Sequence, residues 1–195
     1  YLGSVICAVC HLQSIEIVHR DIHPDNLLVS ASGHLRLVDF GCAKLLQDCQ
    51  ASFTLCGQPE YTAPELIQER PLSFASDWWS IGILGYLMLF GETPFAADEP
   101  SIVYANVIHY VNGTRKITWP WFSSQATAFI SKLLSVDPAD RLDATSAPTH
   151  PFFGSIYLGE LEEGTVLPPV VPQLDGPSDT KYFEEEDDDD DGEEG

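Results

Sequence analysis

Three short polar motifs in a fixed order constrain the fold of this chain more than any other feature. They are His-Arg-Asp at 19–21, Asp-Phe-Gly at 39–41 and Ala-Pro-Glu at 63–65. Any one of these tripeptides can occur by chance. Their order and separations, with Asn-Leu-Leu at 26–28 and Gly-Gln-Pro-Glu-Tyr at 57–61 between them, make coincidence negligible. The three motifs therefore belong to one site.

The segments around these motifs predict a mainly helical chain with a few short strands. Apolar residues at helical spacing predict helices over 2–12, 80–90, 102–111 and 124–135. β-prone runs between 17 and 29 and over 35–38 predict strands that bracket the first two motifs. Residues 47–61 are polar and irregular, so we expect a long loop there. The predicted fold class is α+β, mainly α-helical.

Composition excludes several classes of function. The net charge is −21, and much of it lies in the acidic run 184–195, which is expected to be disordered. An acidic surface argues against nucleic acid and anionic membranes as partners. The longest apolar run, 81–90, is too short to span a bilayer. With no signal peptide, we expect a location in the cytoplasm, with the nucleus as an alternative.

The five cysteines do not show the spacing of a disulfide framework or of a zinc site. Cys7 and Cys10 form a lone Cys-x-x-Cys, and a structural zinc site would need a second pair. We therefore expect both cysteines to be buried helix residues.

The motifs, taken together, resemble the large, C-terminal lobe of a eukaryotic protein kinase, from residue 1 to about 183. Thr-Leu-Cys-Gly at 54–57 and Asp-Trp-Trp at 77–79 resemble the cAMP- and cGMP-dependent branch of the serine/threonine kinases. Leu-Pro-Pro-Val-Val-Pro at 167–172 is similar to the C-terminal tail of that branch. The expected organisation is a kinase C-lobe with short β-hairpins around the catalytic and metal loops (1–153), a kinase tail (154–183) and an acidic tail (184–195).

The resemblance implies an ATP-dependent enzyme that transfers the γ-phosphate to a serine or threonine hydroxyl of a protein substrate. Asp21 would orient that hydroxyl or accept its proton, and Asn26 and Asp39 would hold two Mg²⁺ ions through oxygen atoms. Each residue also has a purely structural interpretation. Asp21 could cap a turn, Asp39 could form an Asx turn at the end of a strand, and Asn26 could tolerate a left-handed backbone.

Other residues match the activation-loop and tail positions of the family. Arg20 and Lys44 stand where a basic pair grips a phosphate, and Thr54 stands where that phosphate is carried. A phosphate on Thr54 would pair with Arg20 and order the loop. The alternative is an ordinary exposed loop threonine. Phe183 matches the tail aromatic residue that reaches the adenine site.

The resemblance assigns substrate contacts and structural supports as well. The expected substrate-binding residues are Asp25, Leu55, Pro59 and Glu60. The expected structural residues are Glu65 and Arg141, as a buried ion pair, and Asp77, which would hold the backbone of the catalytic loop. His19 is expected to be a packed residue rather than a base.

Two departures affect the catalytic expectation. The family has lysine where this chain has His23, which we retain as a catalytic residue beside Asp21 and Asn26. Histidine is shorter and, unlike lysine, mostly neutral at neutral pH, so we expect phosphoryl transfer slower by a factor on the order of 10–1,000. Gln58 replaces a threonine that bridges the catalytic aspartate and lysine in the family.

The sequence contains no Gly-x-Gly-x-x-Gly loop, and it opens on tyrosine rather than methionine. We therefore expect the small N-lobe to be missing and the chain by itself to be inactive, because catalysis here depends on positioning ATP. The alternative is a non-catalytic kinase-like binding module. The sequence upstream of Tyr1 would discriminate the two. A regulatory subunit or domain outside this chain is the other partner that the resemblance implies.

Overall fold

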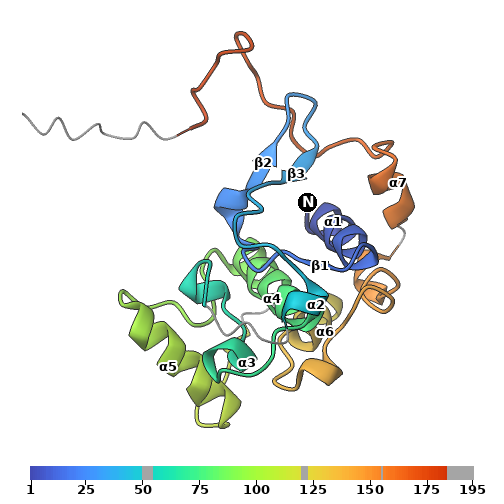
Figure 1. Cartoon of the computed structure of the whole chain (residues 1–195). Helices are drawn as coiled ribbons and strands as arrows, with labels where there is room; N and C mark the ends of the chain where they lie inside the picture. The colour runs from blue at the N-terminus through green and yellow to red at the C-terminus, as the bar shows by residue number, and fades with distance from the viewer. Residues whose placement is uncertain (50–54, 120–122, 155, 184–195) are drawn as a thin grey trace, which may run out of the picture.

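The computed structural model describes residues 1–49, 55–119, 123–154 and 156–183. The chain folds as a mainly helical body with two small two-stranded sheets, as predicted (Figure 1). Its α-helices are α1 (Leu2–Ser14), α2 (Leu46–Cys49), α3 (Pro64–Ile67), α4 (Phe74–Phe90), α5 (Pro100–Val111), α6 (Ser124–Leu133) and α7 (Leu158–Glu162). Short 3-10 turns lie at η1 (Pro24–Asn26), η2 (Pro59–Tyr61), η3 (Pro138–Asp140) and η4 (Pro151–Phe153).

Helix α4 forms the centre of the core and contacts α1 and α6 (Figure 1). The Ser73 hydroxyl caps its first turn by accepting from the Ala75 N–H at 3.3 Å, and Gly91 ends it with a φ of 81°. The helix begins six residues before the predicted start at residue 80. The apolar pattern missed this turn because its polar residues, Ser76 and Asp77, are buried.

The two sheets place strands beside the first two motifs. Strands β2 (Leu27–Val29) and β3 (Leu35–Leu37) form an antiparallel hairpin, whereas β1 (Ile17–Val18) pairs with β4 (Lys44–Leu45). The structure therefore confirms short antiparallel strand pairs around the two loops, and β2–β3 is the pair that forms a tight hairpin. The β1–β4 pair joins segments that are distant in sequence, because the whole catalytic and metal-loop region lies between them.

The predicted loop over 47–61 contains more structure than expected. Residues up to Cys49 continue α2, and Pro59 opens η2 because proline fits the first position of a helical turn. Thr54 lies outside the described residues, so the expected phosphorylation site has no structural account.

The segment after Phe153 packs against the body rather than simply extending from it. Helix α7, which the sequence did not predict, lies beside α1, and Leu158 is buried there. Farther on, the Tyr1 hydroxyl donates to the Val170 carbonyl at 3.2 Å. A Cβ on Gly33 would lie 2.4 Å from that carbonyl oxygen, so only glycine lets the β2–β3 turn approach the tail. Among the described helices, none combines the length and apolarity that crossing a bilayer would require.

Candidate active site

Asp77, on α4, holds the backbone of the first motif. Its two carboxylate oxygens accept hydrogen bonds from the N–H groups of His19 and Arg20, both at 2.8 Å. Arg20 has a φ of 74°, a left-handed conformation that is unfavourable for a residue with a side chain, and these two bonds offset its cost. Burial raises the pKa of the Asp77 carboxyl to about 6, although the two backbone donors act in the opposite direction.

His19 connects the first motif to the second. Its ring is fully buried, with Nε2 3.2 Å from the Val38 carbonyl oxygen and Nδ1 accepting from the Asp21 N–H at 3.4 Å. The ring also meets Phe40 edge-on, with centroids 4.9 Å apart. Burial lowers the pKa of His19 and so favours the neutral imidazole. These contacts describe a packed structural residue.

Asn26 links the loop that carries Asp21 to the strand end that precedes Asp39. The Asn26 side-chain amide donates to the Asp21 carbonyl at 2.9 Å, and the Asn26 carbonyl accepts from the Val38 N–H at 3.0 Å. Asn26 is buried, whereas Asp39 is exposed. The orientation of the amide leaves its oxygen as the atom able to bind a cation.

Asp39 has a left-handed backbone, with a φ of 58°. Its Oδ1 atom accepts from the Gly41 N–H at 2.9 Å, which is an Asx turn. The structural interpretation of Asp39 as a turn residue is thus real, and it is compatible with metal binding because a carboxylate has further lone pairs. A strained aspartate held at a strand end beside Asn26 fits a site for hard cations.

Asp21, His23, Asp25 and Gln58 make a closed ring of contacts. His23 Nε2 lies 3.3 Å from Asp21 Oδ1, and His23 Nδ1 lies 3.4 Å from Asp25 Oδ2. The Gln58 side-chain amide donates to Asp25 Oδ2 at 3.5 Å, and the Gln58 N–H donates to Asp21 Oδ1 at 3.3 Å. Although Nδ1 is within ion-pair distance of Asp25, it is not aligned for a hydrogen bond and is buried with no such partner among the described residues.

Gly57 lets the segment that carries Gln58 come this close to Asp21. Its φ is 84°, and a Cβ at this position would lie 2.6 Å from Asp21 Oδ1. Both the backbone conformation and the space therefore require glycine.

Of the expected substrate-binding residues, Asp25 belongs to this ring, and the other three flank Gln58 in the sequence. Leu55 is exposed, and Pro59 and Glu60 are half-buried on η2. Glu60 accepts a 2.6 Å hydrogen bond from the Thr93 hydroxyl, a contact that the sequence did not suggest because no motif contains Thr93. Asp25 exposes 78% of its side chain.

The backbone segments that carry Arg20 and Lys44, the expected phosphate-binding pair, lie side by side. Thr54, which would carry the phosphate, is outside the described residues. Lys44 in β4 pairs with Val18 in β1, two residues before Arg20. Phe183, in contrast, exposes 62% of its surface, and its N–H donates to the Thr180 carbonyl at 2.8 Å. The described contacts of Phe183 are local to the tail and include none of the motif residues.

Glu65 and Arg141 form a bidentate ion pair, with both N–O distances 2.7 Å. Their side chains are 4% and 1% exposed. Ser76 donates a further hydrogen bond to Glu65 at 3.0 Å, which only the fold could reveal because Ser76 belongs to no motif. The pair joins the end of the third motif to the segment after α6.

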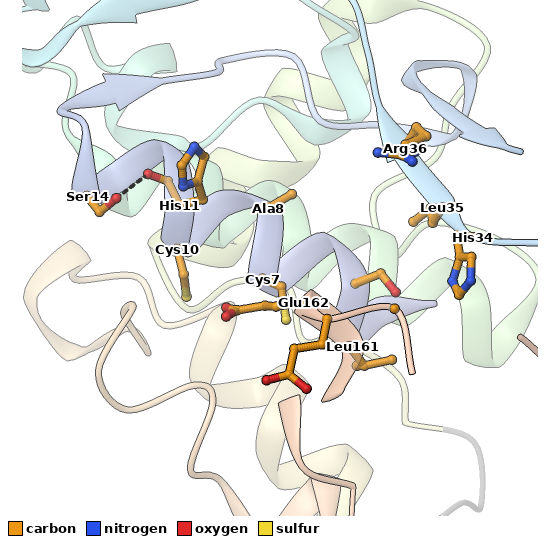
Figure 2. Close-up of a pocket in the computed structure, with 13 residues that line it drawn as sticks. Cys7, Ala8, Cys10, His11, Ser14, His34, Leu35, Arg36, Leu161 and Glu162 are labelled. Atoms are coloured by element: carbon orange, nitrogen blue, oxygen red, sulfur yellow. Dashed lines mark hydrogen bonds between the residues drawn. The ribbon is translucent and has the colours of Figure 1, made fainter. Parts of the chain in front are cut away.

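A cavity of about 830 Å³ lies away from these residues, between α1, β3 and α7 (Figure 2). Cys7 and Cys10 lie along one wall, and their thiols donate to the carbonyls of Leu158 and Ala144 at 3.5 and 3.7 Å. Burial, followed by nearby negative groups, raises the pKa of both thiols to about 11. The two cysteines are therefore unreactive helix residues, Cys7 buried and Cys10 half-buried.

Comparison with known proteins identifies the family of this site. The sequence model of the protein kinase domain matches residues 1–153. The human cAMP-dependent protein kinase catalytic subunit PRKX is 40% identical over 190 residues, which cover 94% of this chain and 51% of that protein. A probable serine/threonine-protein kinase from Dictyostelium discoideum is 40% identical over 189 residues (94% of this chain and 40% of that protein). Rat protein kinase C delta type is 35% identical over 191 residues, which are 94% of this chain and 27% of that protein.

The chain spans about half, or less, of the length of these curated relatives. Its match to the domain model nevertheless covers all three motifs and the whole helical body around them. The chain therefore belongs to the protein kinase family, within the branch of serine/threonine kinases that includes the cAMP-dependent catalytic subunits.

Proposed function

We propose that this chain is the catalytic lobe of an ATP-dependent serine/threonine kinase that phosphorylates a hydroxyl of a protein substrate. The observation that carries the proposal is the set of hydrogen bonds that ties Asp21, Asn26 and the end of β3 into one site. The similarity of this chain to proteins named as serine/threonine or cAMP-dependent kinases supports the same activity. The cytoplasm is the proposed location, and a regulatory subunit or domain outside the chain is a proposed partner.

In this proposal Asp21 orients the substrate hydroxyl and receives its proton. Gln58 donates its backbone N–H to one carboxylate oxygen of Asp21, so the other oxygen is available to the incoming hydroxyl. Asn26 Oδ1 and the Asp39 carboxylate would hold Mg²⁺, which neutralises charge on the phosphates when it is bound. Both are oxygen ligands on a rigid frame, so their chemistry fits this cation.

Two measurements test the metal site and the reaction. Mn²⁺ titrated into ¹⁵N-labelled protein should broaden the amide signals around Asn26 and Asp39, and Asp39→Ala should abolish the broadening. An unchanged response in Asp39→Ala would remove Asp39 from the site. Phosphate transfer from labelled ATP to serine peptides should be absent for the chain by itself, and transfer by the chain joined to a kinase small lobe should require Asp21. Activity of the chain that Asp21→Ala abolishes would refute the expected dependence on a small lobe.

The second candidate is a kinase-like binding module without catalysis. Two residues favour it: His23, where the family has a lysine, and Gln58, where the family has a threonine. The discriminating test joins the chain to a kinase small lobe and measures phosphate transfer with and without His23→Lys. Faster transfer in the variant supports the enzyme, with His23 as a less effective replacement for the lysine of the family. Unchanged transfer would show that position 23 does not limit the rate, and no transfer in either form supports the binding module.

A further inference from the structure

The side chain of Gln58 lies between the activation segment and the catalytic loop. Its amide is 3.5 Å from the carboxylate of Asp25, a residue 33 positions earlier in the chain. The Gln58 backbone is fixed independently of this contact, because its N–H donates to Asp21 and its carbonyl accepts from the Tyr61 N–H at 3.1 Å and the Thr62 hydroxyl at 3.3 Å. The side-chain amide is therefore not needed to hold the backbone in place and can donate to Asp25.

Asp25 in turn lies beside a buried atom that lacks a hydrogen bond. The side chain of His23 is 7% exposed, and its Nδ1 atom is buried with no hydrogen-bond partner in the described part of the chain. The carboxylate of Asp25 lies 3.4 Å from this atom. A buried polar atom without a partner is costly, so the position of this carboxylate matters to the orientation of the imidazole.

Nothing in its own packing fixes the Asp25 carboxylate, because 78% of the side chain is exposed. An exposed carboxylate rotates freely unless a hydrogen bond restrains it. The amide of Gln58 supplies that restraint from the opposite side of the ring. Each of the four contacts, at 3.3–3.5 Å, is long, and an exposed contact of this length contributes little to stability. Its effect is on geometry.

We propose that Gln58 is a positioning residue for His23. Its side-chain amide holds the Asp25 carboxylate against His23 Nδ1, and the imidazole is thereby fixed with Nε2 facing Asp21. The inference deepens the proposed function and rests on it, since Asp21, which His23 Nε2 contacts, is its catalytic group. It also links the two departures from the family pattern. His23 is shorter than the lysine it replaces, and Gln58, which is longer than the threonine it replaces, reaches the Asp25 carboxylate beside His23.

The test uses the chain labelled with ¹⁵N-histidine and a long-range ¹H–¹⁵N spectrum of the imidazole rings. The chain has six histidines, and the His23 signals are those lost in His23→Gln. Gln58→Ala and the size-matched Gln58→Glu, which removes the amide donor, should both shift the His23 ring signals by more than their linewidth. Gln125→Ala, at an exposed glutamine on α6, is the matched control and should leave them in place.

Two further comparisons separate positioning from loss of structure. The signals of buried His19 should stay in place, and the melting temperature should not change in either Gln58 variant. Asp25→Ala should shift the His23 signals, and adding Gln58→Ala to it should shift them no further. Unmoved His23 signals in both Gln58 variants would overturn the proposal, as would additive shifts in the double variant. Neither readout depends on phosphate transfer, so failure of the proposed activity would be seen separately.

Discussion

The ion pair between Glu65 and Arg141 allows a quantitative prediction about stability. Arg141→Met leaves the Glu65 carboxylate buried, with the Ser76 hydroxyl as its one remaining hydrogen-bond donor among the described residues. It also removes the donors to the carbonyls of Ser135 and Ala75, which the guanidinium contacts at 2.8 and 2.9 Å. Removing one partner of a buried pair costs about 3–5 kcal/mol. We expect a similar cost for Glu65→Leu, which leaves the guanidinium unpaired.

The double variant separates the pair from its surroundings. In Glu65→Leu with Arg141→Met neither charge of the pair remains. The carbonyls of Ser135, Ala75 and, at 3.4 Å, Val136 lose their donor, and the Ser76 hydroxyl loses its acceptor. The carbonyl losses occur equally in Arg141→Met and in the double variant, so the double variant should cost no more than Arg141→Met by itself. Its cost is then below the sum of the single variants by about the 3–5 kcal/mol expected for Glu65→Leu. The coupling between the two positions should therefore be at least about 2 kcal/mol.

Urea unfolding followed by tryptophan fluorescence measures these free energies. Trp78 and Trp79 are buried on α4, and the Arg141 guanidinium lies 5.1 Å from the Trp79 ring centroid, so the signal reports on this region. Arg115→Met is a matched control, because the Arg115 guanidinium contacts Asn106 and a carbonyl but no carboxylate in the described ion pairs. Costs that add to within about 0.5 kcal/mol would refute the argument that unpaired charge dominates.

Three more predictions follow from the core and the catalytic loop. Gly82→Ala places a Cβ 2.7 Å from the Leu134 side chain, so overpacking should cost about 1–3 kcal/mol in urea unfolding, and an unchanged midpoint would contradict it. Gly57→Ala should displace the Asp21 carboxylate and lower the free energy of unfolding by about 1–2 kcal/mol because of the positive φ, which calorimetry can measure. An unchanged stability would mean that this loop readily rearranges. The pKa of Asp77 is raised from 3.8 to about 6, so its contribution to stability is full below about pH 4 and is lost as the pH rises through 6. Relative to Asp77→Asn, the free energy of unfolding of the protein should rise by about 1 kcal/mol when the pH is lowered from 7 to 5. A fall over the same range would contradict a raised pKa.

The sequence by itself determined the family and the main helices. Motif order is a one-dimensional property, and the apolar spacing of α1 and α6 reports directly on which side of each helix is buried, so both could be read without coordinates. The start of α4 could not, because the polar residues Ser76 and Asp77 interrupt the apolar spacing. They are buried against Glu65 and the backbone of residues 19 and 20, which lie far away in the sequence. The β1–β4 pair and helix α7 were missed for a related reason: their partners lie far away in the sequence.

At the candidate site the division is sharper. The sequence predicted Asp21, Asn26 and Asp39 as site residues by type and spacing, and it marked His23 and Gln58 as separate departures from the family. Only the tertiary structure decided that these two departures meet through Asp25, because a hydrogen bond between residues 25 and 58 depends on how the chain closes on itself. Local spacing carries no information about such a contact. The physical reason is that motifs record which groups the chemistry needs, whereas long-range packing determines which of them touch.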